Sequence, residues 1–253
     1  MLFRYLCLEI RQLRQYKTDF LIGAVPHLLA QLANIFFFRF VLDVVTEIKG
    51  WTYHQLLFIY GFSLLVFGLF FLFFGNFRNL KAMLFRGEFE ILRLRPLSVI
   101  HHIMVSSFQS ESLEQIVTGI AVLAVSIHYL KIAVTLPMLL ALLFFAACGT
   151  VALGGLAIIS SAILLFTGGT FSPLASIISL SDFTKYPLTI FDEAVIAIFT
   201  WIIPIGLVSY YPSVYFLKSA NTLLYCGLIA AAFLLLGVFL FRCALRRFQG
   251  ISS

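Results

Sequence analysis

Few side chains in this 253-residue sequence have the types and spacing that chemistry requires. A nucleotide-binding loop needs Gly-x-x-x-x-Gly-Lys-Ser/Thr, because its backbone N–H groups and its lysine hold phosphates. No Gly-Lys pair occurs in the chain, and neither a His-Glu-x-x-His zinc motif nor a Gly-x-Ser-x-Gly nucleophile motif is present. The sequence therefore predicts no catalytic residue, metal ligand or cofactor site, and the chain is not expected to be an enzyme.

The histidines and cysteines are not spaced as metal ligands. His101 and His102 are adjacent, so their rings would point to different faces of a helix, as surface residues do. The four cysteines lack Cys-x-x-Cys spacing and lie in or beside apolar runs, where small packing residues are expected: Cys7, Cys148, Cys226 and Cys243.

The densest group of charges lies in RGEFEILRLRPLSVI, residues 86–100, which has five charges in its first ten positions. On a helix the region would have an apolar face of Phe85, Phe89 and Leu92 and a charged face of Arg86, Glu90 and Arg93, whose opposite charges are spaced to pair. Pro96 biases Arg95 away from helix, so the helix should end there. The pattern predicts a short amphipathic helix that either docks on a partner or lies at the membrane surface with a solvated face.

A second group of polar residues lies inside apolar runs, where ionisable groups are costly and therefore candidates for function. Arg39 is four residues before Asp43, so we expect the two to pair on one helical face. His27 and Gln31 have the same spacing and could form an interhelical hydrogen bond. His128 is a further isolated example. So few ionisable groups disfavour a carrier driven by an ion gradient.

The elements that hold these residues are predicted from composition. The chain is 62% hydrophobic and 11% charged, with 29 Phe and a mean hydropathy of +1.05, so it has too few polar side chains to cover a water-soluble surface. It is predicted to be an all-α polytopic membrane protein. Since a crossing takes about 20 apolar residues, the first three spans are predicted at Phe20–Val41, Leu56–Phe77 and Leu113–Leu130. The segment 112–115, Ser-Leu-Glu-Gln, has capping-box spacing between Ser112 and Gln115 at the start of the third.

The run from Ile132 to Ser181 has no charge and is long enough for two crossings, with a turn expected at 167–170, Thr-Gly-Gly-Thr. The next segment, 182–219, is predicted to be an outer re-entrant hairpin, because Pro204 interrupts its apolar middle. The alternative makes 173–188 the non-crossing piece and 190–208 the fifth span, in place of 170–185. The last span is Ala220–Phe241, which gives six crossings.

Twelve of the 17 Lys and Arg lie in three segments: before the first span, between the second and third, and after the last. The positive-inside rule places all three in the cytoplasm, and with them both termini. This distribution predicts contact with membrane lipid and not with nucleic acid. Residues 1–253 form one transmembrane domain with a surface amphipathic helix at 1–19, for which a simple basic flank is the alternative, and a cytoplasmic coupling segment at 78–112.

Two blocks of the sequence resemble one family. Gly87, Glu88 and the run Leu94 to Ser98 are similar to the "G-E-hydrophobic-D-x-x-x-L-R-P-L-S" segment of a branch of the type 2 ATP-binding cassette (ABC) exporter permeases, with Glu90 where Asp is commoner. YPLTIF at 186–191, IIP at 202–204 and YYP at 210–212 resemble the family's signature before the last span. Its residues here include Tyr186, Pro187, Pro204 and Pro212.

The resemblance implies a permease subunit of an ATP-driven exporter in the bacterial inner membrane, paired with a second permease, the same or related. A separate cytoplasmic subunit would bind ATP and Mg²⁺ and contact a coupling helix between the second and third spans. The expected polar contacts are Arg86, Glu88, Glu90, Arg93 and Arg95, with Phe89 and Leu92 packing the helix to that subunit or to the spans, before Pro96. The spans, rich in Phe, Leu, Ser and Gly, suggest a hydrophobic or amphipathic substrate. An ion-gradient carrier and a non-transporting scaffold are the alternatives.

Overall fold

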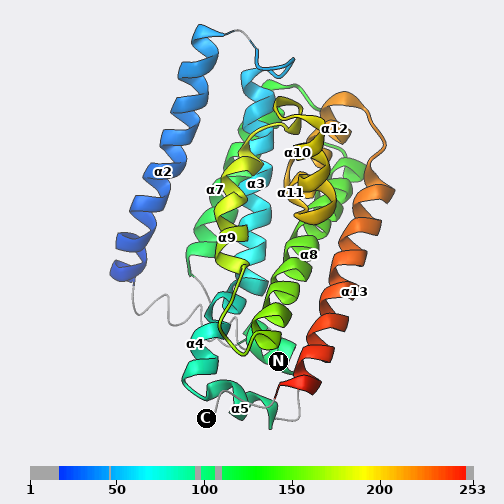
Figure 1. Cartoon of the computed structure of the whole chain (residues 1–253). Helices are drawn as coiled ribbons and strands as arrows, with labels where there is room; N and C mark the ends of the chain where they lie inside the picture. The colour runs from blue at the N-terminus through cyan, green and yellow to red at the C-terminus, as the bar shows by residue number, and fades with distance from the viewer. Residues whose placement is uncertain (1–16, 46, 95–97, 106–109, 249–253) are drawn as a thin grey trace.

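Helices form every named element of the chain in a computed structural model that describes residues 17–45, 47–94, 98–105 and 110–248 (Figure 1). In chain order they are α2 (Lys17–Val44), α3 (Tyr53–Phe74), η1 (Gly75–Asn79), α4 (Leu80–Phe85), α5 (Glu88–Arg93), α6 (Val99–Val105), α7 (Ser110–Tyr129), α8 (Leu136–Phe166), α9 (Leu174–Ser179), η2 (Leu180–Lys185), η3 (Leu188–Ile190), α10 (Glu193–Ala197), η4 (Ile198–Ile202), α11 (Ile205–Val208), α12 (Tyr210–Lys218) and α13 (Leu223–Arg247). This confirms the predicted all-α class. Most of the helix predicted at 1–19 lies outside the described residues.

Five described stretches are long and apolar enough to cross a membrane: Val25–Val44, Tyr53–Phe85, Ser112–Tyr129, Leu136–Phe166 and Leu223–Arg247. Each overlaps a predicted span, so the chain is a multi-pass membrane protein. The helices run in alternating directions between two ends of the bundle (Figure 1). We refer to the end that carries α4 and α5 as the α5 end, and to the opposite end, before α3, as the Trp51 end.

Small residues let the long helices approach closely. A Cβ added to Gly155 of α8 would lie 2.5 Å from the Phe233 carbonyl carbon of α13, and one added to Gly119 of α7 would lie 2.6 Å from the Leu65 backbone nitrogen of α3. Close approach of backbones is how helices associate in membranes, where lipid removes the usual hydrophobic driving force. The α3–α7 and α8–α13 pairs therefore form the core of the bundle.

Helix α2 stands apart from this core (Figure 1). Apolar side chains along it are exposed, including Leu29 at 60% and Phe36 at 69%, and its buried residues are few. Phe38 is one of them, and its ring meets the Tyr60 ring of α3 edge-on with centroids 5.8 Å apart. The single protomer leaves most of the α2 surface to be covered by lipid or another protein.

The turn predicted at 167–170 is present, and Gly168 and Gly169 have φ values of +61° and +86°, which favour glycine. After the turn, the Lys81 ammonium donates to the Thr170 carbonyl oxygen (3.4 Å) at the α5 end, whereas the Trp51 indole N–H donates to the Thr189 hydroxyl (3.0 Å) at the other. Residues 170–189 therefore run from one end of the bundle to the other, through α9 and the tighter helix η2 rather than one long helix.

Residues 190–218 leave the Trp51 end and return to it. The hairpin descends through α10 and η4, turns at Pro204, and continues through α11 and α12. Its tip reaches Gly149, about 20 Å along α8 at 1.5 Å per residue, where an added Cβ would lie 3.2 Å from the Leu207 carbonyl oxygen. The Lys218 ammonium then lies 4.2 Å from the centre of the Trp51 ring. This geometry favours 170–185 over 190–208 as the fifth crossing; the count of six crossings stays a prediction.

Candidate functional site

The α5 end carries the charged segment, and a glycine divides it into two helices. Gly87 has φ +72° and ψ 0°, the left-handed region, so α4 ends and α5 begins in a new direction. Phe85 consequently belongs to α4 and is 63% exposed. The prediction that Phe85 shares one helical face with Phe89 and Leu92 is wrong, because that pattern assumed a continuous helix.

Phe89 fixes α5 to the bundle. Its side chain is 1% exposed and meets the Phe248 ring edge-on, with centroids 5.6 Å apart, just beyond the end of α13. An Arg93 guanidinium N–H donates to the Phe248 carbonyl oxygen at 3.3 Å. Leu92 packs on the same core. Of the two predicted alternatives for Phe89 and Leu92, the structure shows packing on the bundle, and Phe89 and Arg93 hold α5 to Phe248, the residue that follows the last span.

The opposite face of α5 is uncovered. Glu90 is exposed, Ile91 is 59% exposed and Leu94 is 87% exposed. Glu90 is predicted to pair with Arg86 and Arg93, but the structure shows other partners for both arginines. The Arg86 guanidinium lies 3.5 Å from a Glu88 carboxylate oxygen, and the Arg93 guanidinium donates to the Phe248 carbonyl oxygen. Arg95 and Pro96 lie outside the described residues. We call Arg86, Glu88, Glu90, Ile91 and Leu94 the α5 face; it combines charge with large apolar side chains.

A buried carboxylate lies between α2 and α7. Glu114 is 7% exposed, and its carboxylate accepts hydrogen bonds from the Gln31 amide (3.2 Å) and from the Thr118 hydroxyl (3.2 Å). The Tyr60 hydroxyl also lies 3.5 Å from the Gln31 carbonyl oxygen. The capping-box interpretation of Ser112 and Gln115 is wrong, because α7 already begins at Ser110 and both residues lie inside it. The pattern did not reveal Glu114 as an interior ionisable group because the predicted span began one residue before it.

A second polar group lies where η2 contacts α2 and α3. The Lys185 ammonium donates to the Asn34 amide oxygen (3.1 Å) and to an Asp182 carboxylate oxygen (3.0 Å). The neighbouring Thr184 hydroxyl is 2.6 Å from the Ser63 hydroxyl, which lies ten residues into the 22-residue α3 and so near its middle. Asp182 is 78% exposed and Lys185 only 17%. The Asp182 carboxylate of this ion pair is therefore exposed on the protomer surface near the middle of a span.

We call Gln31, Asn34, Glu114, Thr118, Asp182 and Lys185 the polar seam. Arg39 and Asp43 lie farther along α2, where they pair at 3.2 Å as expected from their spacing, and the Arg39 guanidinium also lies 5.5 Å from the centre of the Tyr53 ring. His27 lies one turn before Gln31, on an exposed part of α2. The structure joins Gln31 to the seam and places Arg39 with Asp43 toward the Trp51 end.

The residues of the second sequence block shape the hairpin. Tyr186 packs edge-on against Phe38 of α2, with ring centroids 5.8 Å apart, and Pro187 begins η3. Pro204 ends η4 and precedes α11, and Pro212 lies in the first turn of α12, where proline is tolerated. The three prolines are buried. They therefore set the backbone turns of this segment. Among the described residues, no group of three or more His, Cys, Asp or Glu side chains could hold a metal ion.

A bundle of membrane-spanning helices that carries a short amphipathic helix at one end has the architecture of a multi-pass membrane protein. The comparison with protein families supports this class: the model of the ABC-2 family transporter protein matches residues 28–252. The chain belongs to this family. Neither the comparison with curated proteins nor that with solved structures gives a match.

Membership makes the chain an ABC transporter permease, a membrane component that is not itself catalytic, and implies an ATP-binding partner in the ABC system. The match begins within α2 and includes α5 and the hairpin, so both sequence blocks that carried the resemblance lie inside it. The resemblance to type 2 ABC permeases is thereby confirmed.

Proposed function

We propose that this chain is the permease subunit of an ATP-driven exporter and that the α5 face binds its cytoplasmic ATP-binding subunit. The observation that carries the proposal is the two-sided arrangement of α5. Phe89 and Arg93 bind one side to Phe248 after α13, while Ile91 and Leu94 are exposed on the other. Large apolar side chains beside charges are typical of a protein interface, and a clamped helix can pass motion to the span behind it.

The proposed orientation places the α5 end and both termini in the cytoplasm of a bacterial inner membrane. The basic residues at this end support it, because Arg78, Lys81 and Arg86 precede α5, and Arg246 and Arg247 end α13. ATP and Mg²⁺ would be bound by the partner alone. Closure of the ATP-binding subunits would push on α5 and shift the spans between inward-facing and outward-facing states.

The polar seam supports a second permease, the same or related, facing η2 and α2. Asp182 is largely exposed on the protomer near the middle of a span, and a carboxylate facing hydrocarbon at that depth is costly. A water-filled pathway or a second subunit against this face would remove that cost. The seam adds polar groups to a mainly apolar lining, which suits an amphipathic substrate that carries a polar head.

The partner is tested by purifying the tagged chain together with the ATP-binding subunit encoded beside it, and then measuring vanadate-sensitive ATP hydrolysis in lipid bilayers. We expect Ile91→Asp to reduce co-purification and hydrolysis at least tenfold, because it places a charge in an apolar contact. The matched control is Ile190→Asp, an exposed isoleucine at the Trp51 end, which should leave both unchanged.

Two results would contradict the proposal. One is wild-type ATPase capture and hydrolysis by Ile91→Asp, which would remove the α5 face from the interface. The other is transport by the purified chain alone, driven by an ion gradient, which would make it a carrier. The direction of transport is measured in inverted membrane vesicles, where ATP-dependent accumulation of a fluorescent amphipathic substrate in the lumen indicates export.

A further inference from the structure

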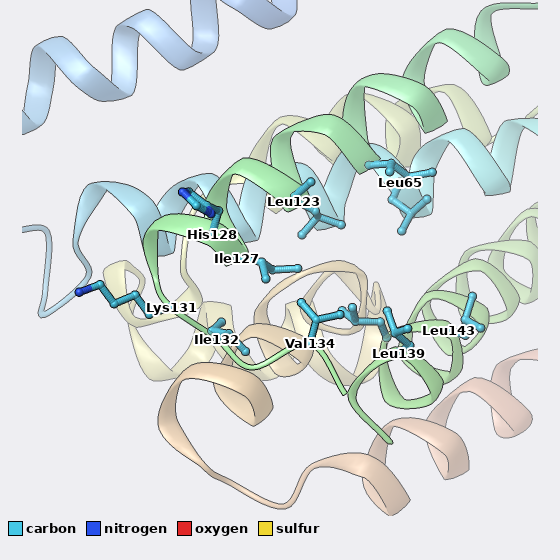
Figure 2. A pocket seen from close by; sticks show the side chains of 12 residues that line it. Leu65, Leu123, Ile127, His128, Lys131, Ile132, Val134, Leu139 and Leu143 are labelled. Atoms are coloured by element: carbon cyan, nitrogen blue, oxygen red, sulfur yellow. The ribbon is translucent and has the colours of Figure 1, made fainter. Parts of the chain in front are cut away.

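An apolar groove lies between α7 and α8. Its volume is about 880 Å³, within the range of about 300–1,000 Å³ that small-molecule sites occupy (Figure 2). Leu65 of α3 also lines it. The remaining residues come from α7, α8 and the loop between them: Ile120, Leu123, Ala124, Ile127, His128, Lys131, Ile132, Val134, Leu139, Leu142 and Leu143.

The length of the groove corresponds to one leaflet. Ile120 lies nine residues before the end of α7, which is about 14 Å at 1.5 Å per residue. Half of a hydrocarbon core of about 30 Å is about 15 Å. Leu65, near the middle of α3, marks the deep part, and Lys131 lies just beyond the last residue of α7. The groove thus extends from the Trp51 end to about half the depth of the bundle.

Polar groups lie at one end of the groove only. His128 and Lys131 are its two residues with basic side chains, and both are exposed at the Trp51 end (Figure 2). Beside them the ring of Tyr129, a residue type enriched at membrane interfaces, stacks on the His54 ring with centroids 4.6 Å apart. The deeper lining is aliphatic, so a matching occupant has an apolar chain and an anionic head.

The end of α7 holds this rim in place. The Ile132 N–H donates to the Ile127 carbonyl (3.2 Å) and the Lys131 N–H to the His128 carbonyl (3.2 Å), the two hydrogen bonds of a Schellman motif. Lys131 takes the left-handed position, with φ +54°, which is uncommon for a residue with a side chain. Ile127 and Ile132, which the motif brings together, both line the groove. The backbone that ends the helix also fixes the lysine at the mouth.

We propose that this groove binds a phospholipid of the leaflet on the Trp51 side, the outer leaflet in the proposed orientation, with an acyl chain along α7 and an anionic phosphate head against Lys131 and His128. Because an acyl chain in the bilayer is already surrounded by hydrocarbon, van der Waals packing against the groove and contacts of the head group must select the lipid. The ammonium group of Lys131 adds electrostatic attraction to an anionic lipid head. The site is separate from the α5 face, and it requires only that the chain spans a membrane.

The test is native mass spectrometry of the chain purified from nanodiscs that contain equal amounts of phosphatidylglycerol and phosphatidylcholine. We expect the wild type to retain phosphatidylglycerol in preference to phosphatidylcholine, and Lys131→Gln to reduce the retained phosphatidylglycerol about fivefold, whereas Lys131→Arg keeps it. The matched control is Lys49→Gln, because Lys49 is also exposed and left-handed near the Trp51 end but does not line the groove. Ala124→Phe fills the groove and should displace both lipids.

Equal retention of the two lipids by the wild type would contradict the proposed preference for an anionic head group. If the wild type retained no lipid, the proposal that the groove binds a phospholipid would be wrong. An equal loss in Lys49→Gln and Lys131→Gln would show general surface attraction instead. The lysine variants change exposed side chains and should fold normally, so the proposal stays testable even where Ala124→Phe fails to fold. Wild-type ATPase capture by Lys131→Gln would be expected, since the α5 face is at the other end of the bundle.

Discussion

Replacement of Phe89 by alanine should detach α5 from the last span without unfolding the bundle. The Phe89 side chain is 1% exposed and lies against Phe248, while α5 is only six residues long and has little else to fix it. The energetic cost should therefore fall on the docking of α5. The rest of the core, the α3–α7 and α8–α13 pairs, does not depend on this ring.

The size of the effect follows from burial. Full burial of a phenylalanine side chain contributes about 1.5–3 kcal/mol relative to exposure, and 1.4 kcal/mol corresponds to a factor of ten. The population with α5 detached should therefore rise roughly 10- to 150-fold in Phe89→Ala. The edge-on aromatic contact adds about 0.5–1.5 kcal/mol, so the double variant with Phe248→Ala should show a coupling energy of about 1 kcal/mol.

Hydrogen–deuterium exchange of the peptide that covers residues 88–94 measures detachment directly, and ATP hydrolysis coupled to transport measures its consequence. We expect exchange of this peptide in Phe89→Ala to be at least tenfold faster, with uncoupled hydrolysis. Ile91→Ala is the matched control for exchange, because Ile91 is on the same helix but 59% exposed. Exchange within twofold of the wild type would refute the clamp, as would strictly additive effects of the two alanine variants.

Three further predictions concern packing and polar contacts. Gly155→Ala should lower the thermal unfolding midpoint in detergent by several degrees, because its Cβ would lie 2.5 Å from a backbone atom of α13. Gly227→Ala is the control and should leave the midpoint unchanged, because its Cβ would meet only the end of a side chain at 3.2 Å. Equal midpoints of the two variants would contradict the close crossing of α8 and α13. Gln31→Leu removes a donor to the buried Glu114 carboxylate and should cost about 1 kcal/mol in an unfolding assay, and combining it with Glu114→Leu should recover part of the loss. Gly87→Ala introduces a Cβ at φ +72°, so it should destabilise α5 by about 1–2 kcal/mol and speed its hydrogen exchange; an unchanged rate would remove the need for a left-handed residue.

The membrane spans could be predicted because their signal is composition over about 20 residues and does not depend on tertiary contacts. The turn after α8 was equally accessible, since Gly168 and Gly169 occupy positive φ angles that other residues rarely adopt. The pairing of Arg39 with Asp43 followed from a local spacing of four residues. Each of these features is decided within one or two helical turns of the chain.

Features that depend on contacts between distant segments were missed. Glu114 lies in the predicted capping segment because the predicted helix begins three residues too late, and only the position of Gln31, 83 residues away, shows that the Glu114 carboxylate is buried. Gly87 does carry a local signal, because glycine often ends a helix. A pattern that continues one helix through Gly87 places Phe85 on the wrong face. The apolar groove has no sequence signal, because its residues look like any lipid-facing leucines and isoleucines.

The contacts define a continuous route from the α5 face into the membrane. Phe89 and Arg93 contact Phe248, which directly follows α13, and α13 packs on α8 at Gly155 with backbone atoms in near contact. Because the two backbones are close-packed at this crossing, side-chain movements cannot take up a displacement of α5, which would therefore move α13 and α8 together. The hairpin tip at Gly149 rests on the same helix α8. A push at the α5 end would therefore reach the hairpin through one rigid pair of helices, α13 and α8.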